Sequence, residues 1–565
     1  MMAALPNFRR FPRWHSAAWL AVFALVGSLG VAAQQTPAPS ATPAPAGAAN
    51  PQTSPQPTSP AEASGPRLVS QMPPLAPPRP FHFPKVATRT LSNGLRVFVV
   101  SETDSATAQP AVSVELLLPQ AGSVADPPGK PGTAAMVASL LTEGTERRTA
   151  QEINGAIDFV GGSLSATASS DATMVSATVV KKDFDLAMDL LSDITLHPSF
   201  TGAEIARRRQ EALSDLALDY DDAEYLASAA FRRAVYGSNA YGLPPDGTPQ
   251  TVGALTRDDL VGFHDTRYSP QGALLAIAGD VTPEEGFAAA EKYLGAWQSK
   301  AAAPAAVPGA LRPKGPRIFL IEKPDAVQTQ IRVGRTGIQR NHPDYLPLTV
   351  TNQIFGGSYN ARLNTAVRLK KGLTYDASSE FVSYRGAGNF VVSTFTRTEQ
   401  TVAATQLVLD EIRKMSSGDV TPEELDVARD FLAYVFPLHA ETPEDIADRT
   451  LGVAFYGLPA DYLDTYQTNV RAVSAADVKR IAQTYFDPSD LDLVLVGNVA
   501  GFRDALVKML PGAKVIEIPA ERLDLLSPDL QQPAAPPAQP GAPGQGPAGG
   551  PPRSVPPAAG AQPQP

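Results

Sequence analysis

A repeated pattern constrains the fold of this chain more than any other feature. The motif Tyr-Ser-Pro at 268–270 precedes an apolar run at 273–280, and Phe-Asp-Pro at 486–488 precedes a similar run at 491–498, 218 residues further along. The patterns Thr-Gly-Ala-Glu and Thr-Pro-Glu-Glu, which are typical of helix starts, begin 220 residues apart, at Thr201 and Thr421. A nearly constant offset indicates two copies of one module of roughly 220 residues.

Each copy mixes two periodicities. Segments 112–118 and 173–179 are predicted strands, whereas 203–218, 422–436 and 475–485 have apolar residues at helical spacing. Strands and helices that interleave within one module predict an α+β fold. The sequence therefore predicts two tandem homologous α/β modules that face each other across a cleft.

Composition marks the ends of these modules. Segments 35–66 and 527–565 are rich in Pro, Ala, Gln and Gly, and contain too few large apolar residues to pack into a core. A Pro/Ala-rich stretch also joins the two copies. We therefore divide the chain into a signal peptide (1–33), a disordered linker (34–80), an N-terminal module (81–299), a linker (300–315), a C-terminal module (316–525) and a disordered tail (526–565).

The first residues resemble a secretory signal. Arg9, Arg10 and Arg13 precede an apolar run at 17–32, and small residues follow up to Ala33. A retained membrane anchor is the alternative, although the run is short compared with the about 20 residues of a membrane-spanning helix. With no cysteine in the chain, disulfides and thiolate sites are excluded. We predict a bacterial periplasmic protein, without stable membrane insertion after cleavage near Ala33.

The charge of the chain limits the classes of molecule that it is expected to bind. The formal net charge is −10, and no long Lys/Arg run offsets it. Nucleic acid and anionic membrane surfaces both favour basic patches, so neither is expected as a partner.

Several motifs occur in the order found in one peptidase family. They are LSNGLRV at 91–97, KPGTA at 130–134, FGGS at 355–358 and RLKKGLTY at 368–375. Together with the duplication, they make the chain resemble the insulinase-like M16 metallopeptidases over about 85–510. The resemblance implies two M16-type modules and peptides, short or unfolded, as the class of substrate.

The zinc-binding motif of that family is absent. In M16 peptidases a helix carries H-x-x-E-H, in which the two His bind zinc and the Glu activates water. The corresponding positions here are Ala135, Ala138 and Ser139, which supply neither imidazole nor carboxylate. No two of the six His lie within five residues of each other. We expect a purely structural helix at 134–141 and no metal bound by this chain.

Other hydrolytic chemistry finds little support. Glu204, Glu211 and Asp215 lie roughly where the resemblance places the third zinc ligand. Without the His pair, we interpret them as a solvated helix face. A serine hydrolase is disfavoured because the chain has no Gly-x-Ser-x-Gly elbow.

Arg368 and Tyr375 match a substrate-binding pair of the resembling family. In a purely structural interpretation, Arg368, Lys370 and Lys371 complement the negative end of a helix that Gly372 caps in the left-handed conformation. In a functional interpretation, the turn at Gly372 brings the guanidinium and the phenol together. There they would donate hydrogen bonds to a peptide carbonyl or its oxyanion. The matching spacing favours the functional interpretation.

Some M16 peptidases divide these tasks between two chains, and this chain resembles the one without zinc. We expect a catalytically inert subunit that forms a heterodimer with a zinc-bearing M16 subunit and lends it Arg368 and Tyr375. Zinc is then expected only in the partner. The loop at Gly356 and Gly357 either borders the cleft or forms a turn at the start of a helix. The alternative function is a non-proteolytic scaffold or peptide-binding protein of the same fold.

Overall fold

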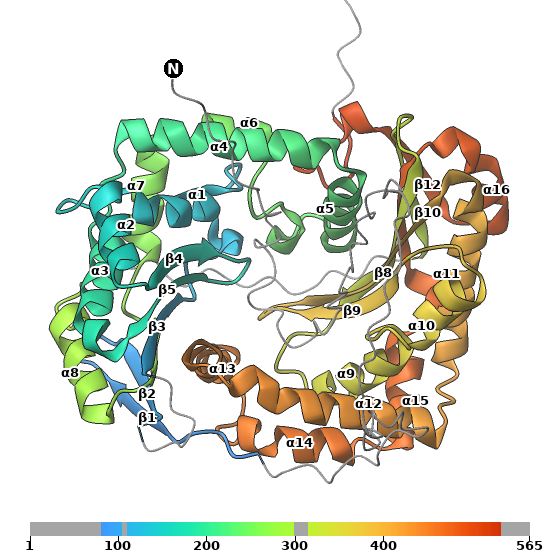
Figure 1. Ribbon diagram of the computed structural model, residues 1–565. Coiled ribbons are helices and arrows are strands. Elements are labelled where there is room, and N and C mark those ends of the chain that lie inside the picture. The colour runs from blue at the N-terminus through green and yellow to red at the C-terminus, as the bar shows by residue number, and fades with distance from the viewer. Residues whose placement is uncertain (1–80, 104–109, 299–314, 533–565) are drawn as a thin grey trace, which may run out of the picture.

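The computed structural model describes residues 81–103, 110–298 and 315–532 (Figure 1). The predicted signal peptide and the linker 34–80 lie outside these residues, as do nearly all of the linker between the modules and most of the tail. Within the described ranges, no helix is long and apolar enough to cross a membrane.

Two mixed sheets, each of six strands within the described residues, form the centres of the two modules. The first sheet has the order β1-β2-β6-β3-β5-β4, and the second has the order β12-β7-β11-β8-β10-β9. The strands of the first sheet are β1 (Val86–Thr90), β2 (Arg96–Ser101), β3 (Ala111–Leu118), β4 (Ser163–Ala168), β5 (Thr173–Val180) and β6 (Leu274–Gly279). Those of the second are β7 (Arg317–Glu322), β8 (Gln328–Gly337), β9 (Ala377–Ser383), β10 (Gly388–Arg397), β11 (Asp492–Gly497) and β12 (Lys514–Pro519).

The register confirms the duplication. Strand β6 runs parallel to β2 and antiparallel to β3, and β11 runs parallel to β7 and antiparallel to β8. All six residues of β6 and of β11 are buried, as expected for central strands. The two sheets differ at one edge, where β1 pairs antiparallel with β2 but β12 pairs parallel with β7.

Helices cover the sheets of both modules. The first module contains α1 (Thr133–Leu140), α2 (Ala150–Phe159), α3 (Phe184–Leu196), α4 (Gly202–Asp221), α5 (Ala223–Tyr236), α6 (Pro249–Ala254), α7 (Arg257–Arg267) and α8 (Pro283–Leu294). The second contains α9 (Tyr345–Phe355), α10 (Arg362–Asn364), α11 (Thr401–Ser416), α12 (Pro422–Val435), α13 (Pro443–Tyr456), α14 (Tyr462–Ala472), α15 (Ala475–Tyr485) and α16 (Arg503–Met509). The prediction of two tandem α+β modules is therefore confirmed.

Equivalent capping residues start equivalent helices. The Thr201 hydroxyl accepts a hydrogen bond from the Glu204 amide at 3.3 Å and begins α4. The Thr421 hydroxyl accepts one from the Glu424 amide at 3.2 Å and begins α12. These are the two helix starts that the repeat predicted. The helices begin there because a threonine cap satisfies an amide left free in the first helical turn.

The two modules exchange one helix. Helix α5 of the first module packs on β11 and β8 of the second, while α13 of the second packs on β6 and β3 of the first. Phe231 of α5 is buried against Val494, and Ile446 of α13 is buried against Ala276. Helices α5 and α13 occupy equivalent positions in the repeat and lie near the middle of Figure 1. Each sheet is thus completed by the other module.

A polar contact also joins the modules, at the turn between β9 and β10. The Tyr241 hydroxyl donates to Asp171 Oδ1 at 2.5 Å and accepts from the Gly386 amide at 3.2 Å. The Arg385 amide donates to Asp171 Oδ2 at 2.9 Å, and the Tyr241 ring stacks on Tyr384 with centroids 4.8 Å apart. The two modules therefore touch through part-buried hydrogen bonds to this turn as well as through the exchanged helices.

Carboxyl groups are buried where β3 meets α13. Glu115 is 2% exposed, and its Oε2 has no hydrogen-bond partner among the described residues. Burial, and then the charges of Asp448, Glu444 and Asp445, raise the pKa of Glu115 well above its usual range. Burial raises the pKa of Asp448 to about 7, although Arg449 acts in the opposite direction. This part of the contact between the modules therefore favours protonated carboxyl groups.

Residues that follow the predicted boundary at 525 pack on the first module. Leu530 is fully buried in the cluster that includes α5, and the Arg233 side chain donates to the carbonyls of Leu526 and Ser527. The Pro-rich composition begins only after these residues. One leucine and two backbone carbonyls therefore anchor residues 526–532 to the rest of the protein.

Candidate functional site

The three predicted motif positions lie on helix α1, in the segment expected to be helical. Ala138 is 2% exposed, Ala135 and Ser139 are half-buried, and the Ser139 hydroxyl donates to the Met136 carbonyl at 2.9 Å. The helix is packed by small side chains, and its only polar group at the three motif positions is directed back to its own backbone.

A guanidinium group contacts this helix. Arg208 on α4 donates to the Ser139 carbonyl from Nε at 3.3 Å and from Nη2 at 3.1 Å. The same side chain pairs with Glu211 at 3.0 Å and with Glu143 at 3.1 Å, and Arg207 donates to the other oxygen of Glu211 at 2.7 Å. Arginine cations therefore hold the acidic side chains beside the motif.

The donor chemistry does not fit zinc. Glu204 and Glu211 have side chains 31% and 43% exposed and are paired with arginine, and Asp215 is exposed on the same helix. The interpretation of these carboxylates as a solvated helix face agrees with this geometry. Among the described residues, no cluster of three His, Cys, Asp or Glu side chains is placed to hold a metal ion.

The segment that carries Arg368 is a π-helix. Helix α10 continues as a π-helix over Thr365–Lys370, which the sequence pattern did not predict. Gly372 follows with φ +62°; its amide donates to the Arg368 carbonyl at 2.9 Å, and the Leu373 amide donates to the Val367 carbonyl at 3.1 Å. The left-handed glycine cap is thus confirmed. Short π-helices occur frequently at functional sites, because the extra residue per turn displaces side chains.

Arg368 contacts an aromatic ring that sequence reasoning missed. Its guanidinium carbon lies 4.7 Å from the centroid of the Tyr359 ring, within the range of a cation–π interaction. Tyr359 is 54% exposed, in the loop that follows α9. The sequence shows this tyrosine two residues after the Gly-Gly pair, but no sequence pattern links it to Arg368.

Tyr375 is an exposed side chain on a fixed backbone. Its side chain is 78% exposed. The Thr396 hydroxyl donates to the Leu373 carbonyl at 2.6 Å, and the Thr394 hydroxyl donates to the Asp376 carbonyl at 2.7 Å. Both threonines are buried on β10. The loop is therefore held on each side of Tyr375, while the phenol faces solvent.

Asn364 connects the two segments. Its Nδ2 donates to the Tyr359 carbonyl at 2.7 Å, and its Oδ1 accepts from the Ala377 amide at 3.4 Å. Within the described part of the chain, the side chains of Arg368 and Tyr375 form no hydrogen bond or cation–π contact with each other. The structure therefore positions the two predicted residues by a shared framework and does not join their side chains.

Gly356 and Gly357 form the end of α9. The amides of both donate to the Asn352 carbonyl, at 2.9 Å and 2.8 Å. A Cβ atom on Gly356 would lie 2.3 Å from the Ser379 hydroxyl, so glycine is required where this helix end packs on β9. Gly356 is buried. The pair therefore ends α9 and does not start a helix, and its place at the border of the cleft stays a prediction.

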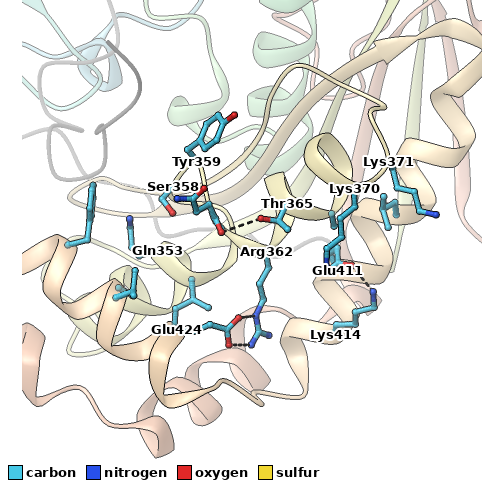
Figure 2. A pocket seen from close by; sticks show the side chains of 18 residues that line it. Gln353, Ser358, Tyr359, Arg362, Thr365, Lys370, Lys371, Glu411, Lys414 and Glu424 are labelled. Carbon is cyan, nitrogen blue, oxygen red and sulfur yellow. Dashed lines mark hydrogen bonds and ion pairs between the residues drawn. The ribbon is translucent and has the colours of Figure 1, made fainter. Parts of the chain in front are cut away.

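A pocket of about 740 Å³ lies on another side of the π-helix (Figure 2). Its walls are the end of α9, the loop after it, the π-helix, α11 and α12. Arg362 crosses the pocket wall and forms a two-pronged pair with Glu424, at 2.6 and 2.5 Å. This pair lowers the pKa of Glu424 and joins α10 to α12.

Family models match both modules. Residues 98–242 match the model described as insulinase (peptidase family M16), and residues 254–432 match the model described as peptidase M16 inactive domain. Together they cover more than half of the chain. The chain belongs to peptidase family M16. The second model begins at α6, before the linker between the modules, so its limits differ from those of the structural repeat.

Similar proteins and structures agree with this assignment. The chain is 29% identical over 346 residues to an uncharacterized zinc protease of Mycobacterium leprae (61% of this chain, 76% of that protein). It is 25% identical over 444 residues to a probable mitochondrial-processing peptidase subunit beta of Arabidopsis thaliana (74% and 80%). A crystal structure of a peptidase M16 inactive domain from Pseudomonas fluorescens matches with a TM-score of 0.68 and 26% identity, covering 73% of this chain and 98% of that one.

Proposed function

We propose that this M16 family protein is an exported, catalytically inert subunit that pairs with a zinc-bearing M16 subunit. In the pair, Arg368 and Tyr375 would bind the peptide substrate in the partner's active site and stabilise the reacting carbonyl. Zinc would belong to the partner subunit alone, and cleavage to the complex. The periplasm is the proposed compartment, and short or unfolded peptides are the proposed substrates.

The position of Tyr375 carries this proposal. A large aromatic side chain that is 78% exposed gains little from folding, yet buried threonines hold the backbone on both sides of it. Rigid support beneath an exposed polar group is what a binding site requires, because the group is placed before the ligand arrives.

The chemistry of the pair suits a peptide carbonyl. A guanidinium donates charge-assisted hydrogen bonds, and a phenol donates a neutral one. Both interactions strengthen when negative charge develops on the carbonyl oxygen, so they would favour the transition state over the bound peptide. The contact of Arg368 with Tyr359 holds the guanidinium in place without using its hydrogen-bond donors on a carboxylate.

The absence of zinc ligands on α1 supports the inert role. The motif positions carry two alanines and a serine, and the nearby carboxylates are held by Arg207 and Arg208. A scaffold or peptide-binding protein of the same fold is the competing function. In that case the Arg368 segment serves only as a capped helix end.

The test begins with the native protein. Co-purification from its own envelope fraction, followed by mass spectrometry, identifies the partner and shows whether the segment before Ala33 has been removed. Peptide cleavage by the complex is then measured with Arg368→Ala or Tyr375→Phe in this chain. We expect kcat/KM to fall about 10- to 1000-fold, with unchanged assembly.

A matched substitution separates the two functions. Arg503→Ala removes an exposed arginine on α16, whose ion pairs are with Asp504 and Glu517, and should leave kcat/KM unchanged. A scaffold predicts the same activity for all three variants and a stability loss of about 0.3 to 1 kcal/mol for Arg368→Ala. Equal activities, or the lack of any M16 partner, would refute the proposal.

A further inference from the structure

The pocket beside the π-helix combines two kinds of wall. One is apolar and includes Ile354, Phe431 and Val427, whose side chain is 68% exposed on α12. The other is polar and consists mainly of the loop after α9 and the π-helix (Figure 2). At about 740 Å³, the pocket lies within the range of about 300–1,000 Å³ that holds small ligands.

The charges in the pocket do not cancel. Arg362 is neutralised by Glu424 at 2.5 Å, and Lys414 is neutralised by Glu411 at 2.6 Å. Lys370 and Lys371 also line the pocket, and neither forms an ion pair with a described residue. One end of the pocket is therefore cationic, and it suits a ligand with a negative charge at its end.

Neutral hydrogen-bonding groups line the loop side of the pocket. Gln353, Ser358 and Asn360 line it, and their side chains form no hydrogen bond with any described residue. An alkyl chain such as that of a fatty acid would leave these groups without partners. A peptide supplies both amide donors and carbonyl acceptors, so it matches this wall better.

We propose that this pocket binds the C-terminal end of a peptide. The terminal carboxylate lies at Lys370 and Lys371, the last peptide groups bond to Gln353 or Asn360, and an apolar terminal side chain packs on Val427. The choice of a peptide as ligand agrees with the proposed function but needs neither zinc nor a partner subunit. The pocket is a second peptide site, on the same π-helix as Arg368.

The experiment measures binding to the isolated chain by fluorescence anisotropy. The probe is fluorescein-Gly-Gly-Gly-Leu with a free C-terminus, compared with the same peptide ending in an amide. We expect the acid to bind more tightly than the amide. The double variant Lys370→Gln/Lys371→Gln should weaken binding of the acid about 2- to 30-fold, as two exposed charge pairs allow, and bring it to the level of the amide.

Two further variants complete the test. Lys508→Gln/Lys514→Gln removes two exposed lysines of the same module that do not line the pocket and should leave the affinity unchanged. Val427→Asp places a negative charge on the apolar wall at an exposed position and should weaken the acid more than the amide.

The outcomes also separate this inference from the proposed function. Tyr375→Phe, at a residue that does not line the pocket, should leave anisotropy binding unchanged even if it abolishes the activity of the complex. Equal affinities of the acid and amide peptides, unaltered binding in the Lys370/Lys371 variant, or no binding at millimolar protein would overturn the inference.

Discussion

Replacing Asp448 by asparagine should stabilise the protein, and more at pH 8 than at pH 5. Asp448 lies on the exchanged helix α13, near Glu115 of β3, and burial raises its pKa from 3.8 to about 7. A carboxyl group whose pKa is raised by folding binds its proton more tightly in the folded state. Its contribution is therefore favourable in acid and is lost as the pH rises from about 4 to about 7.

The magnitude follows from the size of this shift. A rise of about three pKa units corresponds to a destabilisation of up to about 4 kcal/mol at pH 8, at about 1.4 kcal/mol per unit. At pH 5 the destabilisation is only about 1 to 2 kcal/mol. Asp448→Asn removes the charge, so its advantage over the wild type should grow by about 1 to 3 kcal/mol between pH 5 and pH 8.

Scanning calorimetry of the isolated chain measures this growth. Because the two modules share helices, they should unfold together, and about 430 residues at about 2.1 cal/mol/K each give about 1 °C in Tm per kcal/mol. We expect the Tm difference between variant and wild type to be larger at pH 8 than at pH 5 by about 1–3 °C. Asp419→Asn, at an exposed carboxylate, is the control and should show the same small difference at both pH values. The reasoning fails if Asp448→Asn shifts Tm equally at the two pH values or lowers it at pH 8.

Three shorter predictions concern other contacts. The substitutions Ala135→His, Ala138→Glu and Ser139→His restore H-x-x-E-H on α1. The variant should still bind well under one zinc per chain by elemental analysis, because the guanidinium of Arg208 remains beside the helix. Stoichiometric zinc would contradict this. Tyr241→Phe should reduce the free energy of unfolding by about 1 to 3 kcal/mol, since Asp171 loses a buried partner; unchanged denaturant unfolding would contradict it. Arg362→Ala should lower Tm more at pH 7 than at pH 4, because the lowered pKa of Glu424 makes their pair fully stabilising above pH 4.5 and progressively less so as the pH falls below it; an equal loss of Tm at both pH values would contradict this.

Local patterns predicted the elements of the fold well. The helical spacing at 475–485 coincides with α15, and the apolar runs at 273–280 and 491–498 contain β6 and β11. Caps at Thr201 and Thr421 were recognisable because a capping threonine acts on residues three positions away. Such short-range interactions can be recognised from the sequence alone.

Features that depend on distant residues were missed. The periodicity of α5 and α13 shows an apolar face but does not say which sheet covers it, so the helix exchange could not be foreseen. The π-helix at Thr365–Lys370 differs from an α-helix by one residue per turn, which apolar spacing over six residues cannot resolve. Likewise, the contact between Arg368 and Tyr359 depends on how the loop after α9 folds back.

The helix exchange has a consequence for how the chain acquires its structure. Helix α5 ends at Tyr236, but the strand on which it packs, β11, is synthesised more than 250 residues later. The first sheet likewise lacks its covering helix until α13 has been synthesised. Neither module therefore has a complete core until most of the chain is present. Pairing over such sequence separations slows folding and leaves apolar surface exposed in the meantime. A lone module could cover that surface by taking the helix from a second copy of itself, so the duplicated chain has the arrangement of a helix-swapped dimer whose two halves are joined by a peptide connection.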